Sequence, residues 1–213
     1  MSPRRPVARI NRPRPAEAAA RRRRELRVGL LGGSFNPAHE GHLAISREAL
    51  KRLALDHVWW LISPQNPLKP SAGMASFAER LASAQALARP DPRILCSDLE
   101  QRLATRYTVD TLDWLQRHSE LRLVWLIGAD NLLQLPQWHH WGRLLAMVPI
   151  AVFDREPYSH RSVAGRVARR YAQRRLPERD APALAEVRPP AWVYLRLRRH
   201  QESSTAIRRQ RAP

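Results

Sequence analysis

The chain has 213 residues, of which 37 are basic and 19 acidic, so its formal net charge is +18, and it has one cysteine, Cys96. This length suffices for one α/β domain with its own core, and a single cysteine excludes an internal disulfide and fits a reducing cytoplasm. No apolar stretch approaches the roughly 20 residues that span a bilayer. We assign no function to the charge, because only Lys51 and Lys69 are lysines. Such an arginine skew follows as easily from the base composition of a gene as from function.

Residues 1–24 are mostly arginine, proline and alanine, with nine arginines against one acid, Glu17, and almost nothing to bury. This composition predicts a disordered tail, followed by one folded domain at 25–213. Two interpretations of the tail stay open. It is either a tether to nucleic acid or another acidic surface, or the product of a start site placed too far upstream. The apolar run at 28–31 is too short for a signal peptide and leads directly into a glycine-rich turn.

That turn is the most informative stretch of the chain, Gly32–His42, with the sequence GGSFNPAHEGH. It lies between an apolar run and an amphipathic segment, and a strand, glycine-rich turn and helix in this order aim backbone N–H groups at an anion. Gly32 and Gly33 let the backbone approach a phosphate, since they carry no Cβ. His39 and His42 are three residues apart and can face the same side of the helix mouth. The pattern predicts a phosphate cradle with two imidazole donors; a helix-capping turn with two ordinary histidines is the alternative.

The turn does not match other known phosphate or metal motifs. No Gly-Lys-Ser/Thr follows the glycines, so it is not a Walker loop, and their spacing is not that of the dinucleotide fingerprint. The segment His39–His42 is one residue shorter than the zinc-protease motif H-E-x-x-H, which argues against a metal site.

Downstream, short apolar runs alternate with helical segments. This alternation predicts a single-domain α/β fold with a doubly wound parallel sheet of Rossmann type. We expect helices that begin after Ser76 and at Thr108, and a loop and a basic helix within the arginine-rich segment 155–190. The expected strands after the turn are His57–Ser63, Arg93–Ser97, Leu121–Ile127 as the central strand, Pro149–Phe153 and Trp192–Leu197.

Ligands of open α/β sheets bind beyond the carboxyl ends of the strands, and polar residues gather there. After the central strand, Gly128 permits close backbone approach, and Asp130 can accept from a ribose hydroxyl or ligate Mg²⁺ through water. Trp138 offers a flat face to an aromatic ring. The alternative is that Asp130 caps a helix and Trp138 belongs to the core.

The glycine-rich turn resembles the signature G-x-F-x-P-x-H-x-G-H of the nucleotidylyltransferase superfamily, which Gly33, Phe35, Pro37, His39, Gly41 and His42 match. Three further segments look like its nicotinate-mononucleotide adenylyltransferase branch: Y-T-x-x-T at Tyr107–Thr111, Gly128-x-Asp130 followed by Leu-Pro-x-Trp138, and Asn66–Lys69. The superfamily's second motif, S-S-T-x-I-R, is matched by Ser203–Arg208. There, hydroxyls cap a helix N-terminus and the guanidinium of Arg208 can reach phosphate oxygens; a capped basic helix without a ligand is the alternative.

The resemblance implies the reaction ATP + nicotinate mononucleotide → deamido-NAD + pyrophosphate in NAD biosynthesis, in the cytoplasm. It implies His39, His42 and Arg208 as catalytic residues. ATP would contact Gly32, Gly33, Ser34, Phe35, Gly41, Lys69, Ser203, Ser204 and Thr205. The acceptor nucleotide would contact Tyr107, Thr108, Gly128, Asp130 and Trp138. Mg²⁺ would arrive with ATP, without a dedicated protein site.

Two alternatives are open. A sibling transferase would use nicotinamide mononucleotide or phosphopantetheine as acceptor, and only the region from Asp130 to Trp138 can separate these. A basic nucleic-acid-binding module belongs to another class, and no RNA-binding signature favours it. We expect no membrane partner.

Overall fold

The computed structural model describes residues 25–65, 73–154 and 157–197. In these ranges, one seven-stranded sheet has the order β3-β2-β1-β4-β5-β7-β6, and every neighbouring pair is parallel. The strands are β1 (Arg27–Gly33), β2 (His57–Ile62), β3 (Ile94–Ser97), β4 (Arg122–Gly128), β5 (Ile150–Phe153), β6 (Arg175–Leu176) and β7 (Trp192–Leu195). The doubly wound parallel sheet is confirmed, and β4 is its central strand as predicted.

The α-helices are α2 (Glu40–Arg52), α3 (Phe77–Ala88), α4 (Leu99–Arg102), α5 (Thr108–His118), α6 (Ala129–Gln134), α7 (Trp141–Met147), α8 (Ser159–Val163) and α9 (Arg166–Arg170). The described ranges also contain three 3-10 helices: η1 (Leu135–Gln137) between α6 and α7, η2 (Ala172–Arg174) between α9 and β6, and η3 (Glu178–Glu186) between β6 and β7. Ser76 caps α3 in a reciprocal capping box with Glu79, as the sequence predicts for its start. No helix within the described ranges is both long and apolar enough to cross a membrane.

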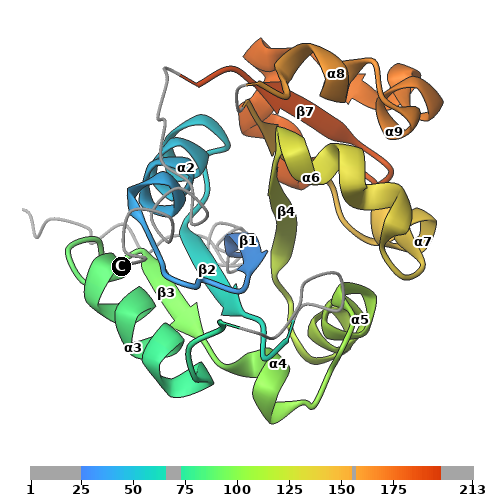
Figure 1. Ribbon diagram of the computed structural model, residues 1–213. Helices are drawn as coiled ribbons and strands as arrows, with labels where there is room; N and C mark the ends of the chain where they lie inside the picture. The colour runs from blue at the N-terminus through green and yellow to red at the C-terminus, as the bar shows by residue number, and fades with distance from the viewer. Residues whose placement is uncertain (1–24, 66–72, 155–156, 198–213) are drawn as a thin grey trace, which may run out of the picture.

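Helices cover both faces of the sheet (Figure 1). On one face α2, α3 and η3 pack around a core that includes Trp60, and on the other α5, α6, α7 and α9 pack around a core that includes Trp125. Both indoles are almost fully buried. Because side chains of a strand alternate between the faces, Leu30 of β1 enters one core and Leu31 the other. The inner strands are therefore apolar on both faces, as a buried parallel sheet requires.

The arginine-rich segment differs from the expected loop and basic helix. It contains α8 and α9, the 3-10 helices η2 and η3, and the edge strand β6, which is only two residues long. The strand exists because Arg175 and Leu176 pair with Trp192 and Val193 of β7. A two-residue strand defined by a partner in β7 leaves no periodicity in its own sequence.

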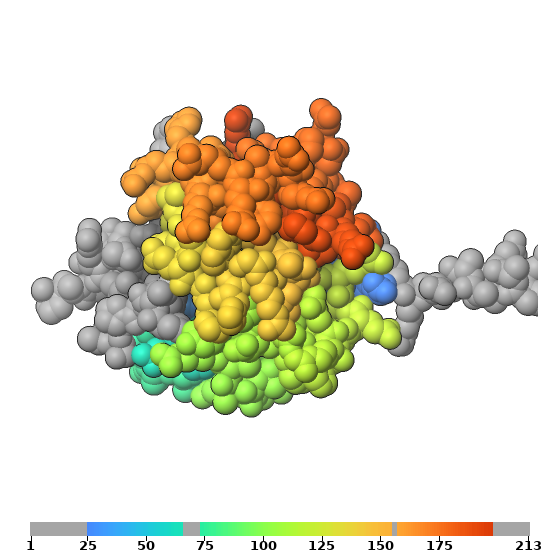
Figure 2. Space-filling model, turned by 90° about the vertical axis from the view of Figure 1, so that its right-hand side faces the viewer, coloured from blue at the N-terminus to red at the C-terminus, as the bar shows by residue number. Residues whose placement is uncertain are grey.

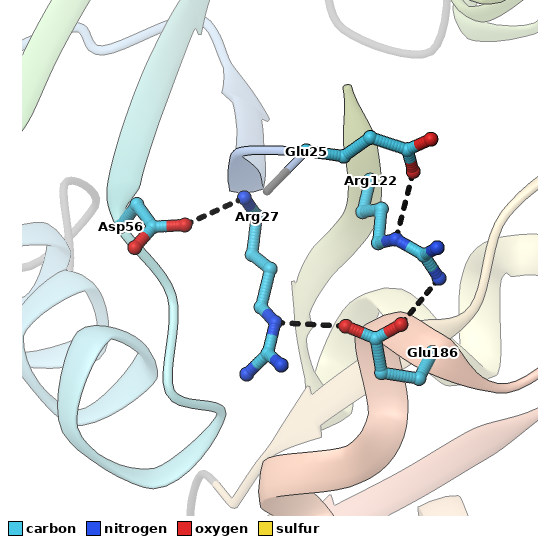
Figure 3. A network of polar contacts seen from close by, with 5 residues as sticks. All are labelled: Glu25, Arg27, Asp56, Arg122 and Glu186. Atoms are coloured by element: carbon cyan, nitrogen blue, oxygen red, sulfur yellow. Dashed lines mark hydrogen bonds and ion pairs between the residues drawn. The ribbon is translucent and has the colours of Figure 1, made fainter. Parts of the chain in front are cut away.

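The amino edge of the sheet is closed by charged side chains (Figure 3). Glu186 of η3 accepts a hydrogen bond from Arg27, at the start of β1, and forms an ion pair with Arg122, at the start of β4; Glu25 lies 2.8 Å from Arg122. Asp56 accepts from the backbone N–H of Arg27 at 2.8 Å. This network leaves the opposite, carboxyl edge for the glycine-rich turn.

Candidate active site

Helix α2 begins at the predicted phosphate turn, and two histidines cap it. His39 is the N-cap residue, with extended backbone, and its Nδ1 accepts from the N–H of Gly41 at 3.1 Å. In return, Nδ1 of His42 accepts from the N–H of His39 at 3.2 Å. The pair forms a reciprocal capping box in which imidazoles stand in for the usual Ser and Glu. The ring centroids are 3.9 Å apart, so both rings lie together at the mouth of the helix.

These hydrogen bonds fix which ring nitrogen donates. A nitrogen that accepts a hydrogen bond carries no proton, so each neutral imidazole holds its proton on Nε2. Both His39 and His42 therefore present an Nε2–H donor on the side away from the capping bonds. The two interpretations of the motif are thus compatible, because capping uses Nδ1 and leaves donation to Nε2.

An aromatic cluster supports the ring of His42. Phe35 stacks on Trp60 at 5.2 Å, and its ring centroid is 4.6 Å from that of His42. The indole N–H of Trp60 donates to Ser46 Oγ, which donates to the carbonyl of His42. Phe35 has φ +47° and its side chain is buried, so it can contact ATP only through its backbone.

Gly32 has a packing role that the sequence does not reveal. A Cβ at this position would lie 2.7 Å from Cη2 of the buried Trp125. At Gly33 the nearest atom to such a Cβ is a ring carbon of Phe35 at 3.4 Å, an ordinary contact. Gly32 is therefore required for the indole of Trp125 to lie beneath the turn, in addition to any approach of a phosphate.

The predicted acceptor residues occupy two helix starts. Tyr107 is the N-cap residue of α5, and Thr108 is its first residue. Gly128 ends β4 and is the N-cap residue of α6. Asp130 is half-buried and lies in the first turn of α6, after the N-cap residue. The alternative interpretation, in which Asp130 caps this helix, is therefore wrong.

Two ring contacts join these segments to each other and to the phosphate turn. Trp138 follows η1, is half-buried, and meets Trp125 edge to face, with centroids 6.5 Å apart. His139 stacks on Tyr107 at 4.1 Å, which ties the α6–α7 connection to the start of α5. Trp125 thus touches both sides of the site, because it also fills the space beside Gly32.

The predicted site residues within the described ranges lie at the place in the sheet where open α/β folds usually bind ligands. β1 pairs with β2 on one side and with β4 on the other, so the strand order reverses between β1 and β4. The crevice outside the carboxyl ends of the strands at this reversal is the usual ligand site of an open α/β sheet. The turn that connects β1 to α2 lies on one side of this reversal, and the start of α6, which follows β4, lies on the other (Figure 1).

Comparison with known proteins decides the family. A model described as cytidylyltransferase-like matches residues 30–210. The chain belongs to this family. A relative from Bradyrhizobium sp. strain BTAi1 is 53% identical over 184 residues, 86% of this chain and 95% of the relative. One from Gluconobacter oxydans is 50% identical over 184 residues, 86% of this chain and 94% of the relative. Both are named probable nicotinate-nucleotide adenylyltransferase, which confirms the resemblance predicted from the motifs.

Among solved structures, Plasmodium falciparum nicotinic acid mononucleotide adenylyltransferase complexed with NaAD is similar, with a TM-score of 0.64 at 14% identity. The similarity covers 87% of this chain and 83% of that one. At this identity the similarity shows that the two proteins share a fold.

Two charged residues near the carboxyl ends of β1 and β2 are buried, which the sequence does not predict. The side chain of Arg80, in α3, is 2% exposed, and that of Glu100, in α4, is 8% exposed. Burial raises the pKa of Glu100 to about 7, although a hydrogen bond with the Ser63 side chain opposes the shift. Both residues lie in ordinary amphipathic segments, and no local pattern distinguishes them from surface charges.

Five of the predicted site residues lie outside the described ranges: Lys69, Ser203, Ser204, Thr205 and Arg208. Asn66–Leu68 and the tail 1–24 lie outside them as well. Within the described ranges, no group of three or more His, Cys, Asp or Glu side chains could hold a metal ion. Asp130, in the first turn of α6, carries a carboxylate, a hard oxygen ligand of the kind that divalent cations such as Mg²⁺ prefer.

Proposed function

We propose that this protein transfers the adenylyl group of ATP to nicotinate mononucleotide, forming deamido-NAD and pyrophosphate in NAD biosynthesis. The observation that carries the proposal is the reciprocal cap of His39 and His42, which directs two Nε2–H donors from the mouth of α2. The relatives about half identical to this chain, named probable nicotinate-nucleotide adenylyltransferase, support the choice of substrates.

The reaction needs positioning and charge stabilisation more than proton transfer. The acceptor's own phosphate has a second pKa near 6 and is mostly ionised at neutral pH, so no general base is required. One of its oxygens attacks the α-phosphorus of ATP in line, and the bond from that phosphorus to the bridging oxygen of the departing pyrophosphate breaks. His39 and His42 donate to the oxygens of the α-phosphate, where negative charge develops.

Charge on the leaving group has to be neutralised as well. Bound Mg²⁺ would neutralise negative charge on the phosphates of ATP. Arg208 and Lys69 would contact the pyrophosphate oxygens, and Asp130 would accept a hydrogen bond from a ribose hydroxyl of the acceptor. The cytoplasmic location expected from the single cysteine stays a prediction.

The residues expected to bind the acceptor favour nicotinate mononucleotide, whose ring carries a carboxylate, over nicotinamide mononucleotide, whose ring carries an amide. The ring of Trp138 would stack on the pyridine ring, and the N-terminus of α5 at Tyr107 and Thr108 offers backbone N–H groups and a positive helix end to a carboxylate. An amide would leave donors unpaired there, at about 1–3 kcal/mol per buried group. Two such mispairings correspond to a preference on the order of 10²-fold for nicotinate mononucleotide.

The test is an acceptor panel. ATP is mixed with nicotinate mononucleotide, nicotinamide mononucleotide or phosphopantetheine, and pyrophosphate release is followed. We expect kcat/KM to be highest for nicotinate mononucleotide, by about 10²-fold over the amide. Equal use of the two pyridine nucleotides would contradict the specificity, and preference for phosphopantetheine would assign the chain to a sibling activity.

The same assay tests the histidine cap. His42→Ala removes one charge-stabilising donor and should lower kcat by about 10²–10³. His118→Ala, at the exposed end of α5, is the matched control and should leave kcat unchanged. Near-normal turnover in folded His42→Ala protein would exclude this ring from the mechanism.

A further inference from the structure

Arg80 is a buried cation whose hydrogen bonds, within the described ranges, all go to backbone carbonyl groups, and its guanidinium carbon also lies 5.4 Å from the ring centroid of Phe77. Its guanidinium donates four hydrogen bonds: to the carbonyl oxygens of Ser34 at 2.6 Å, Ser63 at 2.7 Å, Pro64 at 2.9 Å and Ala75 at 3.1 Å. None of the ion pairs between described residues includes Arg80. Removing a cation from water costs free energy that an apolar side chain would avoid, so packing alone does not account for an arginine here.

The four carbonyls belong to three separate segments around the site. Ser34 is the first residue after β1, Ser63 and Pro64 follow β2, and Ala75 precedes the cap of α3. One nitrogen, Nη1, bonds both Ser34 and Ser63, and the N–H of Ser63 donates to the carbonyl of Gly33 at 2.9 Å. The planar fork of a guanidinium can serve several carbonyls in fixed directions at once. Arg80 thus fixes the exits of two adjacent strands relative to each other.

The contact with Ser34 also determines the orientation of the next amide. The Ser34–Phe35 peptide is trans, and in a planar trans peptide the C=O and the N–H point in opposite directions. With its carbonyl on Arg80, this peptide directs the N–H of Phe35 to the other side of the turn. The backbone of Phe35 is left-handed, a sparsely populated conformation for an aromatic residue that surrounding contacts must hold.

We propose that Arg80 is a positioning residue for ATP: it orients the Ser34–Phe35 peptide so that the N–H of Phe35 binds a phosphate oxygen of the nucleotide. Arg80 acts through the backbone and does not itself touch the substrate. This role rests on the proposed function, because it assigns the phosphate turn to ATP. It predicts that loss of Arg80 weakens ATP binding selectively and leaves binding of the acceptor nucleotide intact.

The experiment compares Arg80→Met and Arg80→Lys with the wild-type protein. Arg89→Met is the matched control, because Arg89 is exposed at the C-cap of the same helix. Steady-state kinetics give kcat and the two KM values, calorimetry gives the Kd of α,β-methylene-ATP, and thermal unfolding gives Tm. We expect Arg80→Met to raise the KM for ATP and the analogue Kd by about tenfold or more, the effect of losing about 1.4 kcal/mol of fixed hydrogen bonding. The KM for nicotinate mononucleotide should change by less than about twofold, and Arg80→Lys should be intermediate, since an ammonium keeps the charge without the fork.

Wild-type KM for ATP and wild-type analogue Kd in folded Arg80→Met protein would overturn the proposal. So would equal losses for ATP and the acceptor, which indicate a merely structural role. If Arg80→Met does not fold, Arg80→Lys decides by the same comparison: a selective loss toward ATP supports the proposal, and no loss or equal losses overturn it. Analogue binding needs no acceptor, so the result stands apart from the acceptor panel, whose failure would overturn the proposed reaction alone.

Discussion

Glu100 is the residue whose charge state should affect stability most directly. Burial raises its pKa from the ordinary value of 4.5 to about 7 in the folded protein. Between these two values the folded state holds a proton that the unfolded state has lost, so the free energy of unfolding falls as pH rises from about 4.5 to about 7. The stabilisation is fully present below about pH 4.5, and its loss by pH 8 is on the order of 3 kcal/mol.

Glu100→Gln should remove this dependence, because an amide keeps a hydrogen bond with Ser63 and has no charge to bury. Urea unfolding at pH 5 and pH 8 measures the effect, and the stability gained by the variant should be larger at pH 8. Glu120→Gln, at an exposed position, is the control and should follow the wild-type curve. If the difference in the free energy of unfolding between Glu100→Gln and the wild type were the same at pH 5 and pH 8, burial of the carboxyl would not be coupled to folding.

At the scale of single residues, the sequence predicts some residues of the candidate site and misses others. His39 and His42 lie three positions apart in a recognisable turn, so their proximity at the helix mouth follows from local spacing. Arg80 is identified only by its partners, and the carbonyl of Ser34 lies 46 positions away along the chain. The stack of His139 on Tyr107 is likewise a contact between segments that no local pattern encodes.

At the scale of elements, the turn between β1 and α2 depends on space beneath it. Gly32→Ala would place a Cβ 2.7 Å from Cη2 of Trp125, which the surrounding core holds in place. Overpacking of this kind costs about 1–3 kcal/mol, and relief by movement of the turn would displace the phosphate cradle. We therefore expect a lower Tm together with a lower kcat/KM for ATP.

Gly142→Ala is the control for that substitution. A Cβ at Gly142, in α7, meets nothing within 4 Å, and alanine is about 0.5–1 kcal/mol better than glycine inside a helix. This variant should be at least as stable as the wild type, with unchanged kinetics. If Gly32→Ala behaved in the same way, Trp125 would have room to move and the packing role of Gly32 would be wrong.

The sequence predicts the long, buried elements better than the short, exposed ones. The core strands β1, β2 and β4 are six or seven residues long and mostly apolar, and their expected positions agree with the structure to within one or two residues. The segment 155–190 was not predictable in this way. Its arginines on α8 and α9 are exposed and are placed by tertiary contacts: Arg166 and Arg170 each lie 5.9 Å from the ring of Trp141.

At the scale of the whole molecule, the candidate active site lies at the carboxyl ends of the strands, and the charged network around Glu186 lies at their amino ends. The face formed by α5, α7 and the α8–α9 segment is a continuous surface, coloured from green through yellow to orange in Figure 2. Asp113 of α5 links the first two of these elements by accepting from Arg143 at 2.7 Å. The charged network of Figure 3 joins β1, β4 and η3 at the amino edge, away from the histidine cap.

This arrangement leads to a prediction about the tail. A chain shortened to begin at Glu25 lacks residues 1–24 but keeps the pair of Glu25 with Arg122, and every described contact of the site lies downstream of it. We expect it to fold with a kcat/KM for both substrates within about twofold of the full chain, because the composition of residues 1–24 offers almost nothing to bury. Loss of activity in a chain that still folds would make the tail part of the site and the boundary at residue 25 wrong.

A second truncation, beginning at Arg27, shows whether the network matters. It removes Glu25 and the carbonyl of Leu26, which accepts from the N–H of Arg122 at 2.9 Å. Exposed ion pairs contribute about 0–1 kcal/mol and a backbone hydrogen bond a similar amount, so urea unfolding should show a loss of about 1–2 kcal/mol relative to the chain beginning at Glu25. Because salt screens the exposed pair, the loss should shrink at high ionic strength, whereas kcat should be unchanged throughout. If, at low salt, the chain beginning at Arg27 were as stable as the chain beginning at Glu25, Glu25 and Leu26 would contribute nothing to the stability of the amino ends of the strands.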